Sequence, residues 1–193
     1  MKIDRAGFFP SARATVFHGI LEQSQVNGLN SLLDAFEAAG ITDARYIAYM
    51  LATAFHETAA TMQPIEEYGH GRGHSYGVPT GMWYQVYDGR GDVQLTWIYN
   101  YAKATTELQK RGVLKPDESM IETPELALRP DVAAAVMIYG MQEGWFTGRK
   151  LADYFNANIT DFISARRIIN GMDCAALIGS YARNFLASIG EMK

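Results

Sequence analysis

The strongest constraint in this sequence is a change of pattern between residues 65 and 97, where helical periodicity stops and glycine becomes frequent. Before and after this stretch, apolar side chains recur at three- and four-residue steps, as they do on one face of an α-helix. Inside it, seven glycines separate tyrosine and tryptophan side chains. Loops this long in a compact domain are usually functional. The pattern predicts an α+β, mainly α-helical fold, with a small irregular or β-rich lobe beside a helical one.

The helical pattern outside this stretch falls into separate segments with recognisable ends. Thr42 or Asp43 can cap the second segment, and Pro64 ends it. The fourth begins at a proline and is apolar on nearly every side, which predicts a central buried helix. VQLTW, residues 93–97, is expected to form a short strand. The predicted helical segments are residues 24–40, 42–62, 98–112, 129–148, 160–171 and 174–190.

Composition narrows the class of protein. The 193 residues suffice for one domain, 1–193, and 48% of them are hydrophobic. The only cysteine, Cys174, excludes an intrachain disulfide and is expected to be buried. A net charge of −4 argues against a protein that grips nucleic acid. We see no signal peptide and no membrane-spanning segment, so we expect a chain that stays in the cytoplasm until something else releases it.

Glu57 lies at the edge of the apolar face predicted for residues 42–62. On a helical wheel of roughly 100° per residue, the apolar centre falls among Ile47, Leu51 and Ala54. A carboxyl at that edge is partly desolvated, which raises its pKa and favours the protonated form that a general acid needs. The alternative is a glutamate at a helix end that is solvated or paired with an arginine.

Glu66 and Glu67 follow Pro64, and an extended segment there would point their side chains to opposite sides. Only one of them could then share a cleft with Glu57. A helix acid and a loop carboxylate together suit cleavage of a glycosidic bond, in which one protonates the leaving oxygen and the other activates water or attacks the sugar. The alternative is a solvated acidic turn. The nearby aromatic side chains could either fill the core or stack on sugar rings.

Metal and phosphate motifs are incomplete in this chain. His56 and Glu57 begin a zinc HExxH pattern, but Ala60 stands where the second histidine is required. His70 and His74 have no third ligand at a metal-like spacing. GHGRGHSYG lacks the Gly-Lys-Ser/Thr ending of a phosphate loop. We therefore expect no metal and no cofactor.

Several stretches together resemble the family 19 glycoside hydrolases, the chitinase-like group that includes phage and prophage endolysins. FHET, followed by YDGRGDVQLTWIYNY, is similar to the family's HET and YYGRGxxQLTWxxNY core, and ARRIING resembles its downstream IING element. PIEEYG resembles the segment after the first glutamate in bacterial and phage members. The resemblance runs from about residue 43 to 190 and implies a lysozyme-like, two-lobed single domain with a cleft.

The resemblance also implies roles for individual residues. It assigns Glu57 as general acid and Glu67 as general base, with Glu66 the alternative base. Arg90 falls where the family has an arginine near the catalytic carboxylates, and Asp88, where an aromatic is usual, places another carboxylate near the site. Thr96, beside Gln94, falls at the position that holds the attacking water. The positions implied to contact substrate are Tyr87, Tyr99, Asn100 and Asn170.

The implied mechanism is inverting, with a water between carboxyl groups that lie roughly 6.5–9.5 Å apart. We expect hydrolysis of the β-1,4 bond of bacterial peptidoglycan, as in a lysozyme-like endolysin. The alternatives are a chitinase that acts on chitin oligosaccharides and a catalytically silent carbohydrate-binding relative. The expected partner is a polysaccharide, with no nucleic acid and no membrane, and the protein is expected to be a monomer.

Overall fold

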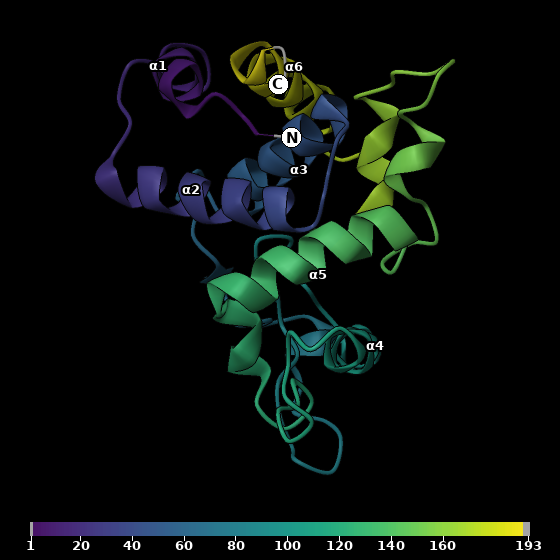
Figure 1. Cartoon of the computed structure of the whole chain (residues 1–193). Helices are drawn as coiled ribbons and strands as arrows, with labels where there is room; N and C mark the ends of the chain where they lie inside the picture. The colour runs from purple at the N-terminus through teal and green to yellow at the C-terminus, as the bar shows by residue number, and fades with distance from the viewer. Residues whose placement is uncertain (1, 191–193) are drawn as a thin grey trace.

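The protein is mainly helical over residues 2–190, which a computed structural model describes (Figure 1). The two strands β1 (Ile65–Glu66) and β2 (Arg90–Gly91) lie between the third and fourth helices in the chain. The α-helices are α1 (Arg5–Thr15), α2 (Gln23–Ala38), α3 (Ala44–Glu57), α4 (Ile98–Lys110), α5 (Pro130–Glu143) and α6 (Ala175–Ile189). The short 3-10 helices are η1 (Ser75–Gly77), η2 (Pro124–Leu128), η3 (Leu151–Asp153) and η4 (Ser164–Ile168).

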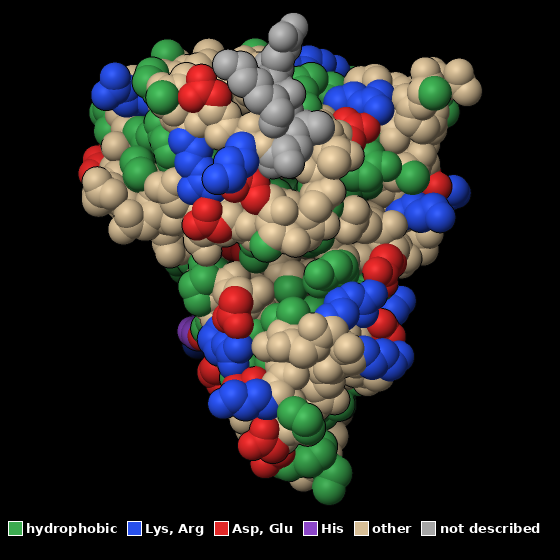
Figure 2. Space-filling model, in the orientation of Figure 1, with side chains coloured by type: hydrophobic (Ala, Val, Ile, Leu, Met, Phe, Trp, Pro, Cys, Tyr) green, Lys and Arg blue, Asp and Glu red, His purple; other side chains and the backbone are tan. Residues whose placement is uncertain are grey.

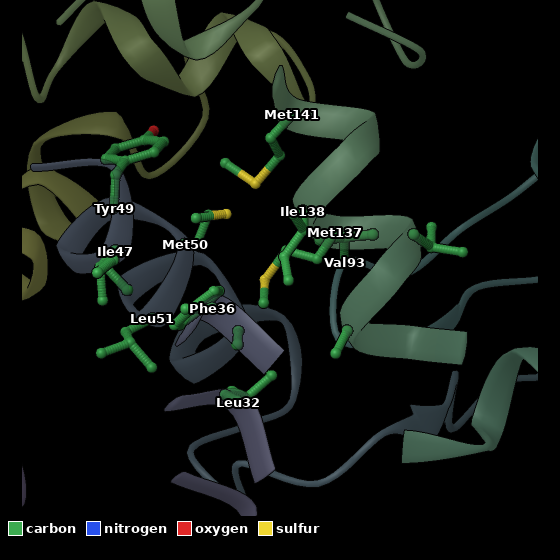
Figure 3. Packing of buried hydrophobic residues seen from close by; sticks show 14 of the residues in the cluster. Leu32, Phe36, Ile47, Tyr49, Met50, Leu51, Val93, Met137, Ile138 and Met141 are labelled. Carbon is green, nitrogen blue, oxygen red and sulfur yellow. The ribbon is translucent and has the colours of Figure 1, made fainter. Parts of the chain in front are cut away.

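Helix α3 is the centre of the hydrophobic core. It begins at the predicted cap, because the Asp43 carboxylate accepts a hydrogen bond from the Arg45 backbone N–H at 2.9 Å. Every residue from 47 to 54 is buried, and α3 packs against α6, α2 and α5. Figure 3 shows Met50 of α3 and Met141 of α5 directed toward one another across this interface. Such full enclosure fixes the position of α3 in the core.

Helix α5 separates the two parts of the molecule. It begins at Pro130 and buries side chains on nearly all sides, which confirms the predicted central helix, but it ends at Glu143, capped by Gly144 with a φ of +74°, and not at the predicted residue 148. In Figure 1, α1, α2, α3 and α6 lie on one side of α5, and α4 and the glycine-rich segment lie on the other. The predicted arrangement of a small irregular lobe beside a helical one is therefore confirmed.

The small lobe contains very little regular sheet. Strands β1 and β2 pair antiparallel, with Ile65 opposite Gly91 and Glu66 opposite Arg90. The strand expected at 93–97 is absent, because this segment turns back on itself and contributes only an isolated bridge between Arg90 and Leu95. This lobe therefore depends on turns and side-chain contacts more than on a sheet.

Three further expectations about local structure are corrected. Helix α1 was not predicted, although Asp4 caps it, because Pro10 lies inside it and interrupts the pattern. The helix expected at 160–171 is reduced to η4 and turns. Cys174 is exposed rather than buried, because it adopts a left-handed φ of 54° just before α6 and its side chain points out of the core.

The surface carries mixed charge. Figure 2 shows acidic and basic side chains interspersed over one face, with no broad area of a single sign. Among the helices of residues 2–190, none combines the length and the hydrophobicity that a transmembrane segment requires.

Asp92, which follows β2, is a buried acid whose Oδ1 has no hydrogen-bond partner within residues 2–190. Burial raises the pKa of its carboxyl from about 3.8 to about 7. The folded chain therefore keeps a proton that the unfolded chain loses above pH 4. The contribution of Asp92 to the free energy of unfolding is consequently highest at low pH and falls as the pH rises from about 4 to 7.

We predict that Asp92→Asn removes this loss, because an amide stays neutral at every pH. Relative to the parent, the variant should gain on the order of 2–4 kcal/mol of unfolding free energy between pH 4 and pH 8. Urea denaturation at several pH values measures the difference. Parallel stability profiles for parent and variant would contradict an ionisable, unpaired Asp92.

Candidate active site

A cleft of about 430 Å³ lies between the end of α3, the small lobe and the segment that follows η4. Its lining combines two carboxylates with amide, hydroxyl and aromatic side chains. The predicted site residues that line it are Glu57, Glu67, Gln94, Thr96, Tyr99, Asn100 and Asn170. Residues separated by more than 100 positions in the sequence therefore meet at one surface. The roles assigned to these residues stay predictions.

Glu57 is the last residue of α3, and the local sequence fixes it there. The Thr58 hydroxyl, which is buried, donates to the Ala54 carbonyl at 2.7 Å and accepts from the Met62 N–H at 3.1 Å. Ala59 and Ala60 then adopt left-handed φ values of 50° and 65°, which end the helix. The Glu57 side chain is only 15% exposed. It is thus half-sheltered at the cleft wall, as the helical wheel predicted.

Arg166 of η4 holds the Glu57 carboxylate, with 2.5 Å between Nη1 and Oε1. The guanidinium is 5% exposed, and its Nε donates to the Asp173 carbonyl at 3.1 Å. The two readings of Glu57 posed from the sequence, a cleft acid and an arginine-paired helix end, therefore both describe it. The sequence analysis missed Arg166, because its contact lies 109 residues away along the chain.

Glu67 reaches the cleft from the residue after β1. Its backbone N–H donates to the Gly89 carbonyl at 2.7 Å, and its Oε2 accepts from the Gly89 N–H at 3.2 Å. Its Oε1 accepts from the Tyr76 hydroxyl at 3.3 Å. Burial, and after it the negative charge of Glu67, raises the pKa of Tyr76, so this hydroxyl remains a donor. Tyr76 was not predicted, although it lies in the glycine-rich stretch.

Glu66 points away from the cleft that Glu67 lines. Its Oε1 lies 2.6 Å from Nη2 of Arg90, and neither Glu66 nor Arg90 is among the lining residues. The separation follows from the extended backbone of β1, in which consecutive side chains point to opposite sides. Of the two candidate bases, only Glu67 shares the cleft with Glu57.

A tight turn between β2 and α4 places the next group of side chains. Gln94, with a left-handed φ of 52°, donates from Nε2 to the Ile65 carbonyl at 3.1 Å. The Thr96 hydroxyl donates to the Gln94 carbonyl at 2.8 Å, and Asn100 donates from Nδ2 to the Thr96 carbonyl at 2.9 Å. Because its proton is engaged, the Thr96 hydroxyl faces the cleft as an acceptor.

Aromatic side chains form one rim of the cleft. Trp97 and Tyr99 stack with ring centroids 6.0 Å apart, and both are exposed. Trp97 holds an unusual φ of +76°, which turns the chain into α4. Phe146 and Ile169 also contribute to the lining, and the sequence analysis missed both. Both of the roles considered for the aromatic side chains occur, at different positions: Trp97 and Tyr99 are exposed at the rim, whereas Tyr101 is fully buried in the core.

Tyr87, Arg90 and Asp88 lie behind the cleft. Tyr87 is 1% exposed and its hydroxyl donates to the Ile121 carbonyl at 2.7 Å, so little of it is left to contact a substrate. Arg90 is predicted to lie near the catalytic carboxylates, but its partners are Glu66 and Asp88 rather than Glu57 or Glu67. Asp88 is fully buried, so it adds no carboxylate to the cleft lining.

No protein-family model and no curated protein matches this chain. Solved structures do match its fold. Chitinase C from Streptomyces griseus HUT6037 superimposes with a TM-score of 0.60 and 24% identity, with 84% of each chain covered. A glutamate-to-glutamine mutant of chitinase C gives 0.58 and 25%, again with 84% of each chain covered.

A bacterial family 19 chitinase, whose structure is described as revealing differences with plant enzymes, gives a TM-score of 0.59 and 21% identity. The match covers 98% of this chain and 96% of that one. The fold expected from the motif resemblance, a mainly helical lysozyme-like domain, is thereby confirmed. The endolysin type stays a prediction.

We predict that Arg90→Met strongly destabilises the small lobe, because it leaves the carboxylates of Glu66 and Asp88 without their shared cation. Breaking such a buried pair costs about 3–5 kcal/mol of unfolding free energy. The control is Arg72→Met, since Arg72 lies in the same lobe and is exposed. Urea denaturation measures both variants, and equal losses would show that the buried contacts of Arg90 contribute nothing specific.

Proposed function

We propose that the chain is a glycoside hydrolase that cleaves β-1,4 bonds between amino sugars, and that its polymer is bacterial peptidoglycan, as in a lysozyme-like endolysin. The observation that carries this proposal is that Glu57 and Glu67 reach one cleft from different structural elements. The exposed Trp97 and Tyr99 at the rim support a sugar substrate, because aromatic faces suit the C–H faces of pyranose rings.

In the proposed reaction, Glu57 protonates the glycosidic oxygen as the bond to the anomeric carbon breaks. Arg166 contacts Oε1 of Glu57, which leaves Oε2 to carry the transferred proton. Glu67 removes a proton from a water molecule, whose oxygen attacks the anomeric carbon from the opposite face. The glycosidic bond is thereby replaced by a bond to the water oxygen, and the configuration is inverted.

The neighbours of Glu67 suit the base in this scheme. The Gly89 N–H and the Tyr76 hydroxyl each donate to one carboxylate oxygen and so fix its orientation. The Thr96 oxygen lines the same cleft and is available to accept the second hydrogen of the water. This assignment requires a gap of roughly 6.5–9.5 Å between the two carboxyl groups, wide enough for one water.

We predict that the parent protein solubilises purified peptidoglycan and lyses permeabilised Gram-negative cells, and that Glu57→Gln abolishes this. An amide cannot supply the proton, so activity should fall at least about 100-fold. Thermal denaturation should show a folded variant, because the amide oxygen still accepts from Arg166. Glu125→Gln, at an exposed position, is the matched control and should keep full activity.

Chitin oligosaccharides are the comparison substrate, since they carry the same bond and the similar structures are chitinases. Cleavage of chitin oligosaccharides without wall lysis would replace the peptidoglycan proposal by a chitinase. Binding of either sugar without cleavage would indicate a catalytically silent relative. An active, folded Glu57→Gln would remove Glu57 from the mechanism.

We predict that Glu67→Gln lowers kcat by orders of magnitude, whereas Glu66→Gln changes it little. Only Glu67 lines the cleft, and Glu66 instead contacts Arg90. Glu66→Gln should therefore reduce the unfolding free energy more than the activity. Steady-state kinetics and urea denaturation on both variants separate these effects. The reverse pattern would assign the base to Glu66.

A further inference from the structure

Three potential metal ligands, none of which lines the cleft, converge beside β1 and β2. Oε2 of Glu66 lies 3.3 Å from Nδ1 of His70, and Oδ2 of Asp88 lies 3.7 Å from the same nitrogen. One ligand atom from each residue lies within 4.8 Å of the other two. The sequence pairs His70 with His74 and offers no third ligand at a metal-like spacing, because Glu66 and Asp88 meet His70 only in the folded chain.

Arg90 fixes the two carboxylates in this arrangement. Its Nη2 contacts Oε1 of Glu66 at 2.6 Å, and its Nη1 contacts Oδ1 of Asp88 at 2.7 Å. The other oxygen of each carboxylate is the one that faces His70. Arg90 is itself 5% exposed, and its Nη1 also donates to the Tyr101 hydroxyl at 3.2 Å. The two free oxygens are therefore held in place from behind.

Asp88 shows that this group is short of a cation. Its side chain is completely buried, and within residues 2–190 neither carboxylate oxygen accepts a well-directed hydrogen bond, the contact of Oδ1 with Arg90 being an ion pair alone. Burying a carboxylate without such partners is costly. The one positive charge of Arg90 faces the two negative charges of Glu66 and Asp88, so one negative charge is left over. The open oxygen of Asp88, Oδ2, is the one that lies near His70.

We propose that Glu66, His70 and Asp88 bind a divalent cation of the Zn²⁺ class. Zinc ligands at about 2.0–2.2 Å in a tetrahedron lie roughly 3.3–3.6 Å apart, close to the two distances given above. An imidazole nitrogen with two carboxylates suits zinc, whereas calcium requires six to eight oxygens. The His70 side chain is 66% exposed, which leaves the fourth position to solvent.

The position of this site gives it a structural consequence. Glu66 precedes Glu67, Asp88 precedes the Gly89 that hydrogen-bonds to Glu67, and the His70 N–H donates to the Glu67 carbonyl at 2.9 Å. A bound ion would join these three segments. If Glu67 is the base, as the proposed function holds, the ion would stiffen its support without touching the substrate. Metal binding itself is independent of that function.

The test is calorimetric titration of ZnCl₂ into the full chain after treatment with a chelator. Because the exposed Cys174 thiol also binds zinc, every variant carries Cys174→Ser. We expect one ion per chain and an increase in Tm, with little response to Mg²⁺ or Ca²⁺. His70→Ala, at an exposed position, should lower the affinity at least ~10-fold.

His74→Ala is the matched control, because His74 lies four residues away in the same loop and stacks on Tyr76 instead. It should bind zinc as the parent does. Asp88→Asn keeps the shape and removes the charge, so it should weaken binding as well. Loss of binding in both His70→Ala and Asp88→Asn, with His74→Ala intact, supports the site.

Two results would overturn it. One is the absence of zinc binding, or zinc binding that is weakened equally by His70→Ala and His74→Ala. The other is a protonated His70, seen by NMR titration at neutral pH, in a chain that binds no zinc. In that case a proton on the imidazole supplies the missing charge. Neither result depends on whether the chain hydrolyses a sugar polymer.

Discussion

The burial of α3 is the constraint on which the rest of the structure depends. Its residues from 47 to 54 are enclosed by α2, α5 and α6, so the helix cannot slide or rotate without exposing apolar surface. Thr58 then closes the last turn with two side-chain hydrogen bonds. Glu57 consequently has a fixed position. Only a few residues follow before β1 pairs with β2, and this pairing fixes Glu67 as well.

The two cleft carboxylates have opposite electrostatic surroundings. Glu57, at the C-terminal end of α3, contacts the guanidinium of Arg166. Among residues 2–190, the donors to the Glu67 carboxylate are neutral, namely the Gly89 N–H and the Tyr76 hydroxyl. A bound sugar would therefore exclude water from two carboxylates whose contact partners already differ.

The sequence predicted those parts of the molecule that local periodicity determines. Helices α2, α3, α4, α5 and α6 follow apolar patterns along the chain, and the Asp43 cap follows from side-chain chemistry, whereas α5 stops at Gly144 instead of the predicted residue 148. Contacts between distant segments left no such trace. Arg166 meets Glu57 across 109 residues, and nothing near either one indicates the pairing. Asp88 was expected to place another carboxylate near the site, but it is buried. The direction of its side chain depends on the turn that brings Arg90 behind it.

The small lobe adds a network of polar contacts to the apolar packing that holds both lobes. With a two-strand sheet of two residues each, it gains little from backbone pairing, and Arg90 connects Glu66, Asp88 and Tyr101 in its place. The charged groups of this network lie on the side away from the cleft. This placement leaves Glu67 beside neutral donors. A cation on the cleft side would pair with Glu67 and compete with the water that Glu67 is proposed to activate. Glu66 is the last residue of β1 and Glu67 directly follows it, so their side chains point to opposite sides and the Arg90 network stays apart from the cleft carboxylates.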